Sequence, residues 1–247
     1  MDRVLQIVEK SNRYRLKPHE VVALQKMRES ETRNILVIGD LHEPFCLDGY
    51  LDWCQEQYDT FNCNQVIFIG DILDNHAFSY HEPDVNGDSA GLELEKSIIK
   101  VAEWYKAFPK ADVCIGNHDR MAARKAMTGG IPAAWIKSYN DVLGTPNWNW
   151  VESVVYDDVL FEHGEGGQAQ SKAKNNLMSS VCGHTHTEAY CKWFVGKKYR
   201  IFGMQVGCGV DSSTYAAAYA KNFKKQAIGA SVVLNNGTLP INLLMPL

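Results

Sequence analysis

Five apolar segments of this sequence end in loops that carry Asp, Asn or His. These loops deliver, in order, Asp40 and His42, Asp71 and Asp74, Asn117 and His118, His163, and finally His184 and His186. Apolar runs rich in β-branched residues are typical of strands buried on both faces, and open α/β sheets form their ligand sites where such strands end. The pattern therefore predicts an α/β fold with one polar site built from several loops.

The second of these segments, residues 66–69, shows the pattern most clearly. It passes through Gly70, which allows a sharp turn, directly into Asp71 and Asp74. One Gly-Asp-x-x-Asp motif is weak evidence, because an Asp in a turn caps the next helix at least as often as it binds a metal. The repetition of the pattern at five strand ends is what favours a ligand site.

The order of elements in the first half predicts a parallel sheet. Strands and helices are expected to alternate at 35–38, 48–58, 66–69, 92–108 and 113–115. Asp48 is a candidate N-cap for the first helix, and two further helices are expected at 119–127 and 132–139. The β-α-β-α-β order implies right-handed crossover connections between parallel strands.

The second half contains three turn signals between apolar runs. Asp157-Asp158, Gly196-Lys197 and Asn235-Asn236-Gly237 each separate two runs with strand character. Antiparallel hairpins are therefore expected at 151–162, 190–202 and 231–244. Together with the parallel first half, they predict two mixed β-sheets packed as a sandwich and flanked by helices, an α/β fold with four α/β/β/α layers.

The length of the chain predicts one main domain. With 247 residues, 45% of them hydrophobic, the chain is long enough for one sizeable core. We expect this domain over residues 34–247 and an N-terminal helical extension over residues 1–33.

The net charge of −4 gives no overall basic field of the kind that favours nucleic acid, although a local groove can still be positive.

The cysteines and the hydropathy pattern predict a cytoplasmic protein. The seven cysteines are odd in number and form no Cys-x-x-Cys pair, so reduced thiols are expected instead of a disulfide framework. The N-terminus lacks the apolar block of a signal peptide, and no window approaches the ~20 apolar residues of a membrane span. No membrane partner is expected, and no feature assigns an oligomeric state.

Seven of the loop residues form a mixed oxygen and nitrogen donor set without cysteine: Asp40, His42, Asp71, Asn117, His163, His184 and His186. Any one of these histidines alone is more often a buried or capping side chain, so the metal hypothesis depends on the whole set. Such donors suit Mn²⁺, Fe²⁺ or Zn²⁺ better than a structural thiolate zinc. Seven donors exceed what one catalytic ion takes, whereas two ions that share a carboxylate would use them all.

The same loops, in the same order, resemble the motif set of the calcineurin-like metallophosphoesterases. The matching motifs are Asp40-x-His42, Gly70-Asp71-x-x-Asp74, Gly116-Asn117-His118-Asp119, His163 and Gly183-His184-x-His186. The resemblance spans residues 35–207. It implies the four-layer fold described above and a hydrolase that acts on phosphoesters.

The resemblance also implies a role for each residue. One ion would be held by Asp40, His42 and His186, the other by Asn117, His163 and His184, with Asp71 bridging both. A hydroxide between the two ions would be the nucleophile. His118 would donate a proton to the leaving oxygen or neutralise charge on the phosphoryl group, while Asp74 would orient it and keep it charged to higher pH. Mn²⁺ is the expected ion, with Fe, Zn or Ni as alternatives.

Two departures from the protein Ser/Thr phosphatases of this family favour a phosphodiesterase or nuclease, whose phosphoester substrate would be a nucleotide or nucleic acid. Asn75 stands where those enzymes carry an Arg, and Asp119 ends a motif that there ends in Glu. The alternative is a phosphomonoesterase that acts on a protein or a small molecule, with Arg120 in place of the missing Arg. A scaffold without catalysis is a third hypothesis, disfavoured because no ligand is missing. Arg120, His76 and His81 are candidate substrate contacts.

Overall fold

The computed structural model describes residues 18, 32–80, 84–214 and 225–247. Contacts divide the chain into two units, Met1–Thr32 and Arg33–Leu247, and the fold described below is that of the second unit. The N-terminal helices predicted within residues 1–33 lie, apart from Pro18, outside the described residues, and so does His81. Among the described helices, none is both long and apolar enough to cross a membrane.

The first sheet has six strands in the order β11-β10-β1-β2-β3-β4. Their bounds are β1 Ile35–Ile38, β2 Gln65–Phe68, β3 Ala111–Cys114, β4 Trp148–Val151, β10 Gly229–Leu234 and β11 Leu239–Leu244. Strands β1 to β4 are parallel, which confirms the pairing predicted for the first half. Strand β10 pairs antiparallel with both β1 and β11, so the hairpin expected at 231–244 completes this sheet.

The second sheet has five strands in the order β5-β6-β7-β9-β8. Their bounds are β5 Ser153–Tyr156, β6 Val159–Glu162, β7 Ser179–Cys182, β8 Tyr190–Val195 and β9 Arg200–Gln205. The predicted β5-β6 hairpin turns through Asp157 and Asp158, whose φ angles of 51° and 61° suit a tight turn. In the β8-β9 hairpin Gly196 N–H donates to the Tyr199 carbonyl oxygen (2.9 Å), so the turn lies at residues 197–198, one position after the expected Gly196-Lys197.

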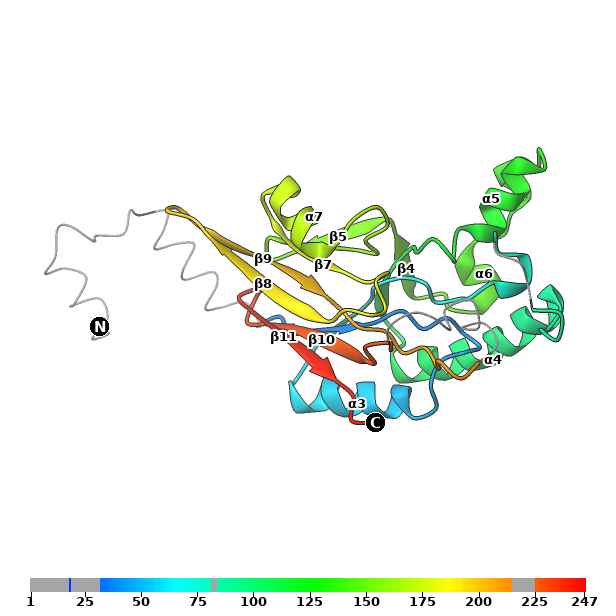
Figure 1. Ribbon diagram of the computed structural model, residues 1–247, viewed down its shortest axis with the longest axis horizontal. Coiled ribbons are helices and arrows are strands. Elements are labelled where there is room, and N and C mark those ends of the chain that lie inside the picture. Colours follow the sequence, from blue (N-terminus) through cyan, green and yellow to red (C-terminus); the bar gives the residue numbers. More distant parts are fainter. Residues whose placement is uncertain (1–17, 19–31, 81–83, 215–224) are drawn as a thin grey trace, which may run out of the picture. The chain divides into compact units, whose positions relative to one another are not determined.

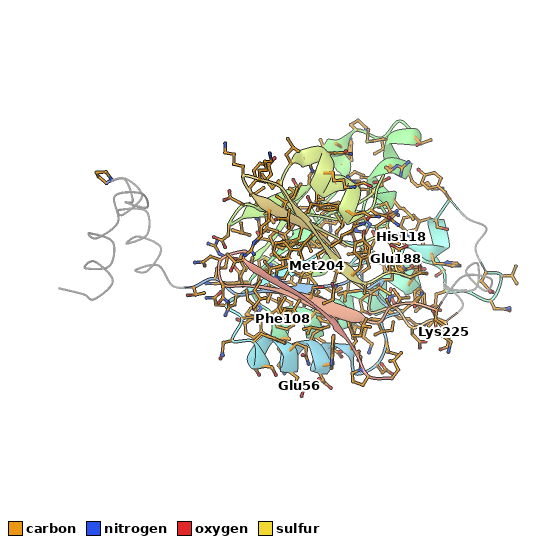
Figure 2. All side chains as sticks on the ribbon, turned by 60° about the vertical axis from the view of Figure 1, so that its left-hand side comes forward. Glu56, Phe108, His118, Glu188, Met204 and Lys225 are labelled. Atoms are coloured by element: carbon orange, nitrogen blue, oxygen red, sulfur yellow. The ribbon has the colours of Figure 1, made fainter. Side chains whose placement is uncertain are left out.

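The two sheets pack face to face with helices on their outer faces, as Figure 1 shows, which confirms the predicted fold. Ile35 of β1 belongs to the core between the sheets, whereas its neighbour Leu36 belongs to the core on the helix side. Figure 2 labels one residue from each core, Met204 between the sheets and Phe108 on the helix side. Burial on both faces explains the continuous apolar runs of the strands.

The α-helices are α3 Tyr50–Thr60, α4 Ala90–Ala107, α5 Met121–Thr128, α6 Tyr139–Leu143 and α7 Ala169–Asn176, with short 3₁₀ helices η1 His76–Phe78 and η2 Ala133–Trp135. Two predictions about them are wrong. The N-cap of α3 is Gly49, with a φ angle of 82°, and not Asp48. No continuous helix spans 132–139, because Pro132 and Ile136 have extended backbones and only η2 forms between them.

Helix α4 supports the loop that follows β1. Trp104 donates a hydrogen bond from Nε1 to Glu43 Oε1 (2.7 Å), and Ser97 donates from its hydroxyl to the Glu43 carbonyl oxygen (3.0 Å). Glu43 is buried and directly follows His42 in the chain. The helix therefore fixes the backbone next to a candidate metal ligand.

Glu43→Gln should change how stability depends on pH. Burial raises the pKa of Glu43 from 4.5 to about 7, so between these values the folded chain binds more protons than the unfolded chain, and the free energy of unfolding falls as pH rises. The variant lacks this decrease. Its unfolding free energy relative to the parent should therefore increase, by on the order of 3 kcal/mol, across this interval. Urea titrations at several pH values measure the difference, and a difference that does not change with pH would contradict the expectation.

Candidate metal centre

The carboxyl ends of five strands deliver polar side chains to one region. The loops after β1, β2 and β3 carry Asp40, His42, Asp71, Asn117 and His118, and the loops after β6 and β7 carry His163, His184 and His186. Backbone hydrogen bonds join these loops. Leu41 N–H and His42 N–H both donate to the Asp71 carbonyl oxygen (3.1 and 2.9 Å), and Gly183 N–H donates to that of His163 (3.0 Å). The region is therefore built from both sheets.

Asp40, His42 and His186 form a first group, whose donor atoms all lie within 4.8 Å of one another. Asp40 Oδ2 is 3.0 Å from His186 Nε2. Two buried atoms of the group, Asp40 Oδ1 and His42 Nε2, have no hydrogen-bond partner among the described residues. Because a buried polar atom without a partner is destabilising, both atoms suit coordination to a cation.

Asp71, His163 and His184 form a second group within the same 4.8 Å limit. His163 Nδ1 lies 3.1 Å from the Ile69 carbonyl oxygen, which can only accept, so this nitrogen carries the proton. A neutral His163 then presents the lone pair of Nε2 to Asn117 Oδ1 (2.9 Å) and Asp71 Oδ2 (3.2 Å). Acceptors that face one another need a proton or a metal ion between them.

Asp71 lies between the two groups. Its Oδ2 is 3.5 Å from His42 Nε2 in the first group and 3.2 Å from His163 Nε2 in the second. Donor atoms of His42, Asp71 and His118 form a third cluster within 4.8 Å. A carboxylate within reach of both groups has the position that a bridging ligand requires.

The buried carboxylates of this region need positive charge beside them. Burial alone would raise the pKa of Asp71, yet the charges of His163 and His42 outweigh it and hold the pKa well below its ordinary value. Burial would likewise lower the pKa of His163, but Asp71 and Asp40 raise it to about 9. Without metal, protons on the imidazoles supply the positive charge, and metal binding would release them. The donor set fits divalent cations in both chemistry and charge.

Four non-glycine residues of these loops have positive φ angles: His42 (52°), Asp71 (48°), Asn75 (54°) and His184 (69°). This backbone region is uncommon outside glycine and costs about 1–3 kcal/mol per residue. It persists only where other contacts enforce it. At His184, for example, the backbone N–H donates to Asp40 Oδ2 (2.8 Å), which joins the last loop to the first.

His118 and Asp74 are in contact, but through different atoms from those that the resemblance implies. His118 Nδ1 lies 2.5 Å from the Asp74 carbonyl oxygen, whereas its distance to Asp74 Oδ1 is 3.7 Å. That carboxylate oxygen pairs with His42 Nδ1 instead (2.6 Å). The expected rise in the pKa of His118 is wrong: burial, and then the charge of His42, lower it. A carbonyl oxygen orients an imidazole without adding the negative charge that would hold its proton.

Asn75 and Asp119 have structural roles that the sequence did not reveal. Asn75 donates from Nδ2 to the His118 carbonyl oxygen (2.8 Å). The buried Asp119 carboxylate accepts from Leu73 N–H (3.1 Å) and Gly116 N–H (2.9 Å). Both residues therefore tie the loop after β2 to the loop after β3. Asn and Asp in turns commonly bond nearby backbone groups, as Asp119 does with Gly116, but the bonds of Asp119 with Leu73 and of Asn75 with His118 join two loops.

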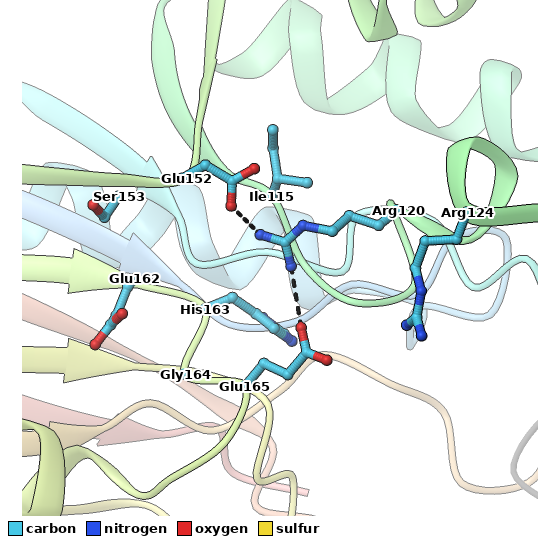
Figure 3. Close-up of a pocket in the computed structure, with 9 residues that line it drawn as sticks. All are labelled: Ile115, Arg120, Arg124, Glu152, Ser153, Glu162, His163, Gly164 and Glu165. Atoms are coloured by element: carbon cyan, nitrogen blue, oxygen red, sulfur yellow. Dashed lines mark hydrogen bonds and ion pairs between the residues drawn. The ribbon is translucent and has the colours of Figure 1, made fainter. Parts of the chain in front are cut away.

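Arg120, a candidate substrate contact, lines a cavity of about 470 Å³ together with His163. Figure 3 shows its guanidinium group between two carboxylates, those of Glu152 and Glu165, with the Glu165 oxygen at 3.2 Å. Both carboxylates are largely exposed and can move. A contact between Arg120 and substrate stays a prediction, and its place beside His163 in one cavity is compatible with it.

His76, the second described candidate for substrate contact, is buried. Its backbone N–H donates to Glu93 Oε1 on α4 (2.7 Å), and its Nε2 accepts from Asp84 N–H (3.1 Å). Glu93 also accepts from the N–H of Ala77 (3.0 Å). These contacts indicate that His76 stabilises its own loop, and they make direct contact with a substrate less favourable.

Comparisons with known proteins bear on this geometry. The sequence model of the calcineurin-like phosphoesterase family matches residues 33–199. No curated protein matches the sequence.

Similar solved structures include the vacuolar protein sorting 29 protein of Cryptosporidium parvum, which is 13% identical with a TM-score of 0.42, over 87% of this chain and 100% of that chain. A metallophosphoesterase from Sphaerobacter thermophilus is 12% identical with a TM-score of 0.45, over 87% and 89% of the two chains. The nuclease MPE of Pseudomonas putida is 16% identical with a TM-score of 0.36, over 85% and 87%.

Gly183→Ala and Gly116→Ala should abolish metal binding. An added Cβ would collide with Asp40 Oδ1 at the first position and with Asp71 Oδ1 at the second, so each substitution displaces a donor carboxylate. We expect Mn²⁺ to raise the melting temperature of the parent protein, and we expect both variants to lose bound metal and this rise with it. Elemental analysis and thermal unfolding measure these effects. Gly91→Ala in α4, where an added Cβ meets nothing within 4 Å, is the control and should bind metal normally. Unchanged metal content in the first two variants would contradict the site.

Proposed function

Because this chain belongs to the calcineurin-like phosphoesterase family, whose model spans residues 33–199, we propose that it hydrolyses phosphodiesters with two divalent metal ions. The observation that carries the proposal is that two groups of donor atoms meet at one shared carboxylate, Asp71. Two-metal hydrolysis of phosphoesters uses ions about 3.5–4 Å apart, a separation that one carboxylate bridges.

The proposed ligands follow the two groups. Asp40, His42 and His186 would hold one ion, Asn117, His163 and His184 the other, and Asp71 both. When bound, the ions neutralise charge on the phosphoryl oxygens and lower the pKa of the attacking water. The chain's own contribution is orientation, since the Ile69 carbonyl oxygen fixes the ring of His163 and the Asp74 carboxylate fixes that of His42. Mn²⁺ is the proposed ion, with Fe, Zn and Ni as alternatives.

His118 is the proposed proton donor. Its Nδ1 donates to the Asp74 carbonyl oxygen (2.5 Å), which fixes the ring and leaves Nε2 to give a proton to the leaving oxygen. One ring nitrogen of His118 belongs to the cluster with His42 and Asp71, so the ring lies beside the proposed metal ligands. Asp74 acts on His118 as a positioning residue through its backbone.

The limited positive charge of the site favours a diester over a monoester. A phosphomonoester carries a charge of about −1.5 to −2 near neutral pH, whereas a diester carries a single negative charge. The neutral Asn75 amide stands where protein phosphatases of this family carry an Arg, and it is engaged with the His118 carbonyl oxygen (2.8 Å). Arg120 is paired with Glu152 and Glu165. These contacts supply less positive charge for a dianion and support the diester.

A phosphomonoesterase is the alternative. It would require Arg120 to leave its two exposed glutamate partners and bind the terminal phosphate, which its place in the cavity beside His163 allows. A scaffold without catalysis is the third candidate, and it would bind metal without turnover.

A comparison of two chromogenic substrates tests the proposal. With Mn²⁺ supplied, the protein should hydrolyse bis-p-nitrophenyl phosphate with a higher kcat/KM than p-nitrophenyl phosphate. Faster turnover of the monoester would support the phosphomonoesterase instead. Bound metal with no turnover of either compound would support the scaffold.

His118→Ala should separate metal binding from turnover. Since His118 is not a proposed ligand, the variant should keep its metal while kcat for the diester falls by about 10²–10⁴-fold, the usual contribution of a general acid. His184→Ala, which removes a proposed ligand, should lose both metal and activity. Elemental analysis alongside steady-state kinetics distinguishes the two variants. Full activity in metal-loaded His118→Ala would overturn the proposed role.

A further inference from the structure

The segment that follows His118 carries concentrated positive charge. Residues 120–140 contain four Lys or Arg and no Asp or Glu, so they carry +4 in a chain with a net charge of −4, and the rest of the chain carries −8. In Figure 1 the helix of this segment, α5, stands away from the two sheets. A cationic segment on an otherwise acidic chain favours an anionic partner.

Large apolar side chains of this segment face solvent, and Trp135 is the most exposed of them at 80%. Tyr80, from the loop after β2, joins them at 55% exposure. The Lys125 ammonium lies 4.2 Å and the Arg124 guanidinium 5.1 Å from the centre of the Tyr80 ring. We call these residues the α5 surface: Tyr80, Arg124, Lys125, Met127, Trp135 and Lys137. Helix α5 contacts η2, which carries Trp135, so the cations and the exposed aromatic side chain come from elements that pack together.

The charges of the α5 surface are open to a ligand. Among the described residues, no carboxylate forms an ion pair with Arg124, Lys125 or Lys137. Arg120 differs, because it already pairs with Glu152 and Glu165.

One residue of the α5 surface, Arg124, reaches the cavity beside the candidate metal centre. Arg124 lines the 470 Å³ cavity that also contains Arg120 and His163, and Figure 3 shows its guanidinium group on the α5 side of that cavity. The C-terminal end of the segment contacts the loop after β3, because Tyr139 donates from its hydroxyl to the Asp119 carbonyl oxygen (3.2 Å). A cavity of this size admits a nucleotide-sized group. The cavity therefore joins His163 of the candidate metal centre to Arg124 of the α5 surface.

We infer that the substrate is a single-stranded nucleic acid that binds along the α5 surface. A phosphate next to the scissile one binds Arg124 in the cavity, and a base stacks on Trp135. The inference rests on the proposed diester hydrolysis and names its substrate class. Guanidinium groups bind phosphates, and aromatic side chains stack with unpaired bases without sequence preference. A duplex has its base faces covered, so it would leave Trp135 without a partner.

Strand β8 offers similar side chains but no connection to the cavity. Trp193 on this edge strand lies under Arg200, with 5.1 Å between the guanidinium carbon and the ring centre, and Lys192 is 5.8 Å from the centre of the Phe194 ring. No residue of β8 lines the cavity beside His163, although the strand is described over its whole length. Trp193 therefore supplies a matched control for Trp135.

Fluorescence anisotropy with a labelled single-stranded oligothymidylate tests the stacking. The metal-loaded His118→Ala protein serves as the background, because it slows cleavage during the measurement. Adding Trp135→Ala should weaken binding about tenfold, the effect of losing one stacked base. Adding Trp193→Ala instead should leave the affinity unchanged. Trp135 is so exposed that its removal should not alter the melting temperature.

The salt dependence of binding tests the phosphate contact. Arg124→Gln should lower the slope of log K against log salt by about 0.7–1, as expected for one lost phosphate contact on a single strand. Lys110→Gln is the charge control, because Lys110 precedes β3 at the amino end of the strand, opposite the metal centre. An equal fall in slope for both variants would contradict a specific role for Arg124.

Hydrolysis of bis-p-nitrophenyl phosphate separates this inference from the proposed function. The small diester does not extend to Trp135, so its turnover should be the same in the parent protein and in Trp135→Ala. If Trp135→Ala changes neither this turnover nor the affinity for the oligonucleotide, the inference is overturned and the proposed function stands. Failure of the parent to hydrolyse any diester would overturn the proposed function itself. Tighter binding of a duplex, or a dimer that Trp135→Ala dissociates without changing oligonucleotide affinity, would also overturn the inference.

Discussion

The contacts of Asp71 are the constraint on which the rest of the site depends. Its backbone carbonyl oxygen accepts from the loop after β1, its Oδ1 accepts from His118 N–H (2.8 Å) in the loop after β3, and its Oδ2 lies 3.2 Å from His163 in the second sheet. This carboxylate is only 1% exposed, so its charge must be matched by neighbours. One residue thus sets both the geometry of three loops and their demand for cations.

Much of the fold follows from local sequence, because its elements are specified by local chemistry. The apolar run at β1 is continuous since the strand is buried on both faces, and Asp157-Asp158 marks a hairpin since both residues tolerate positive φ. The helix expected at 132–139 does not form, and this too is local, because the backbones of Pro132 and Ile136 are extended. The family resemblance supplied the donor residues, and the structure brings their loops together.

The contacts behind the donors could not be predicted, because they join residues that are distant in sequence. The Asp74 carboxylate pairs with His42 (2.6 Å), so His118 meets the Asp74 carbonyl oxygen instead. Asp119 and Asn75 look like ordinary turn residues until their partners in a neighbouring loop are known. Motif spacing identifies donors well, whereas it says little about the contacts that orient them.

The pairing of Asp40 with His186 across 146 positions has a consequence for biosynthesis. A ribosome must translate most of the domain before both halves of the first donor group exist, and β1 receives its antiparallel neighbour β10 later still. A nascent or prematurely terminated chain that ends before His186 therefore lacks one member of the first donor group. In the proposed two-metal site, the first ion would therefore bind only after His186 has been translated.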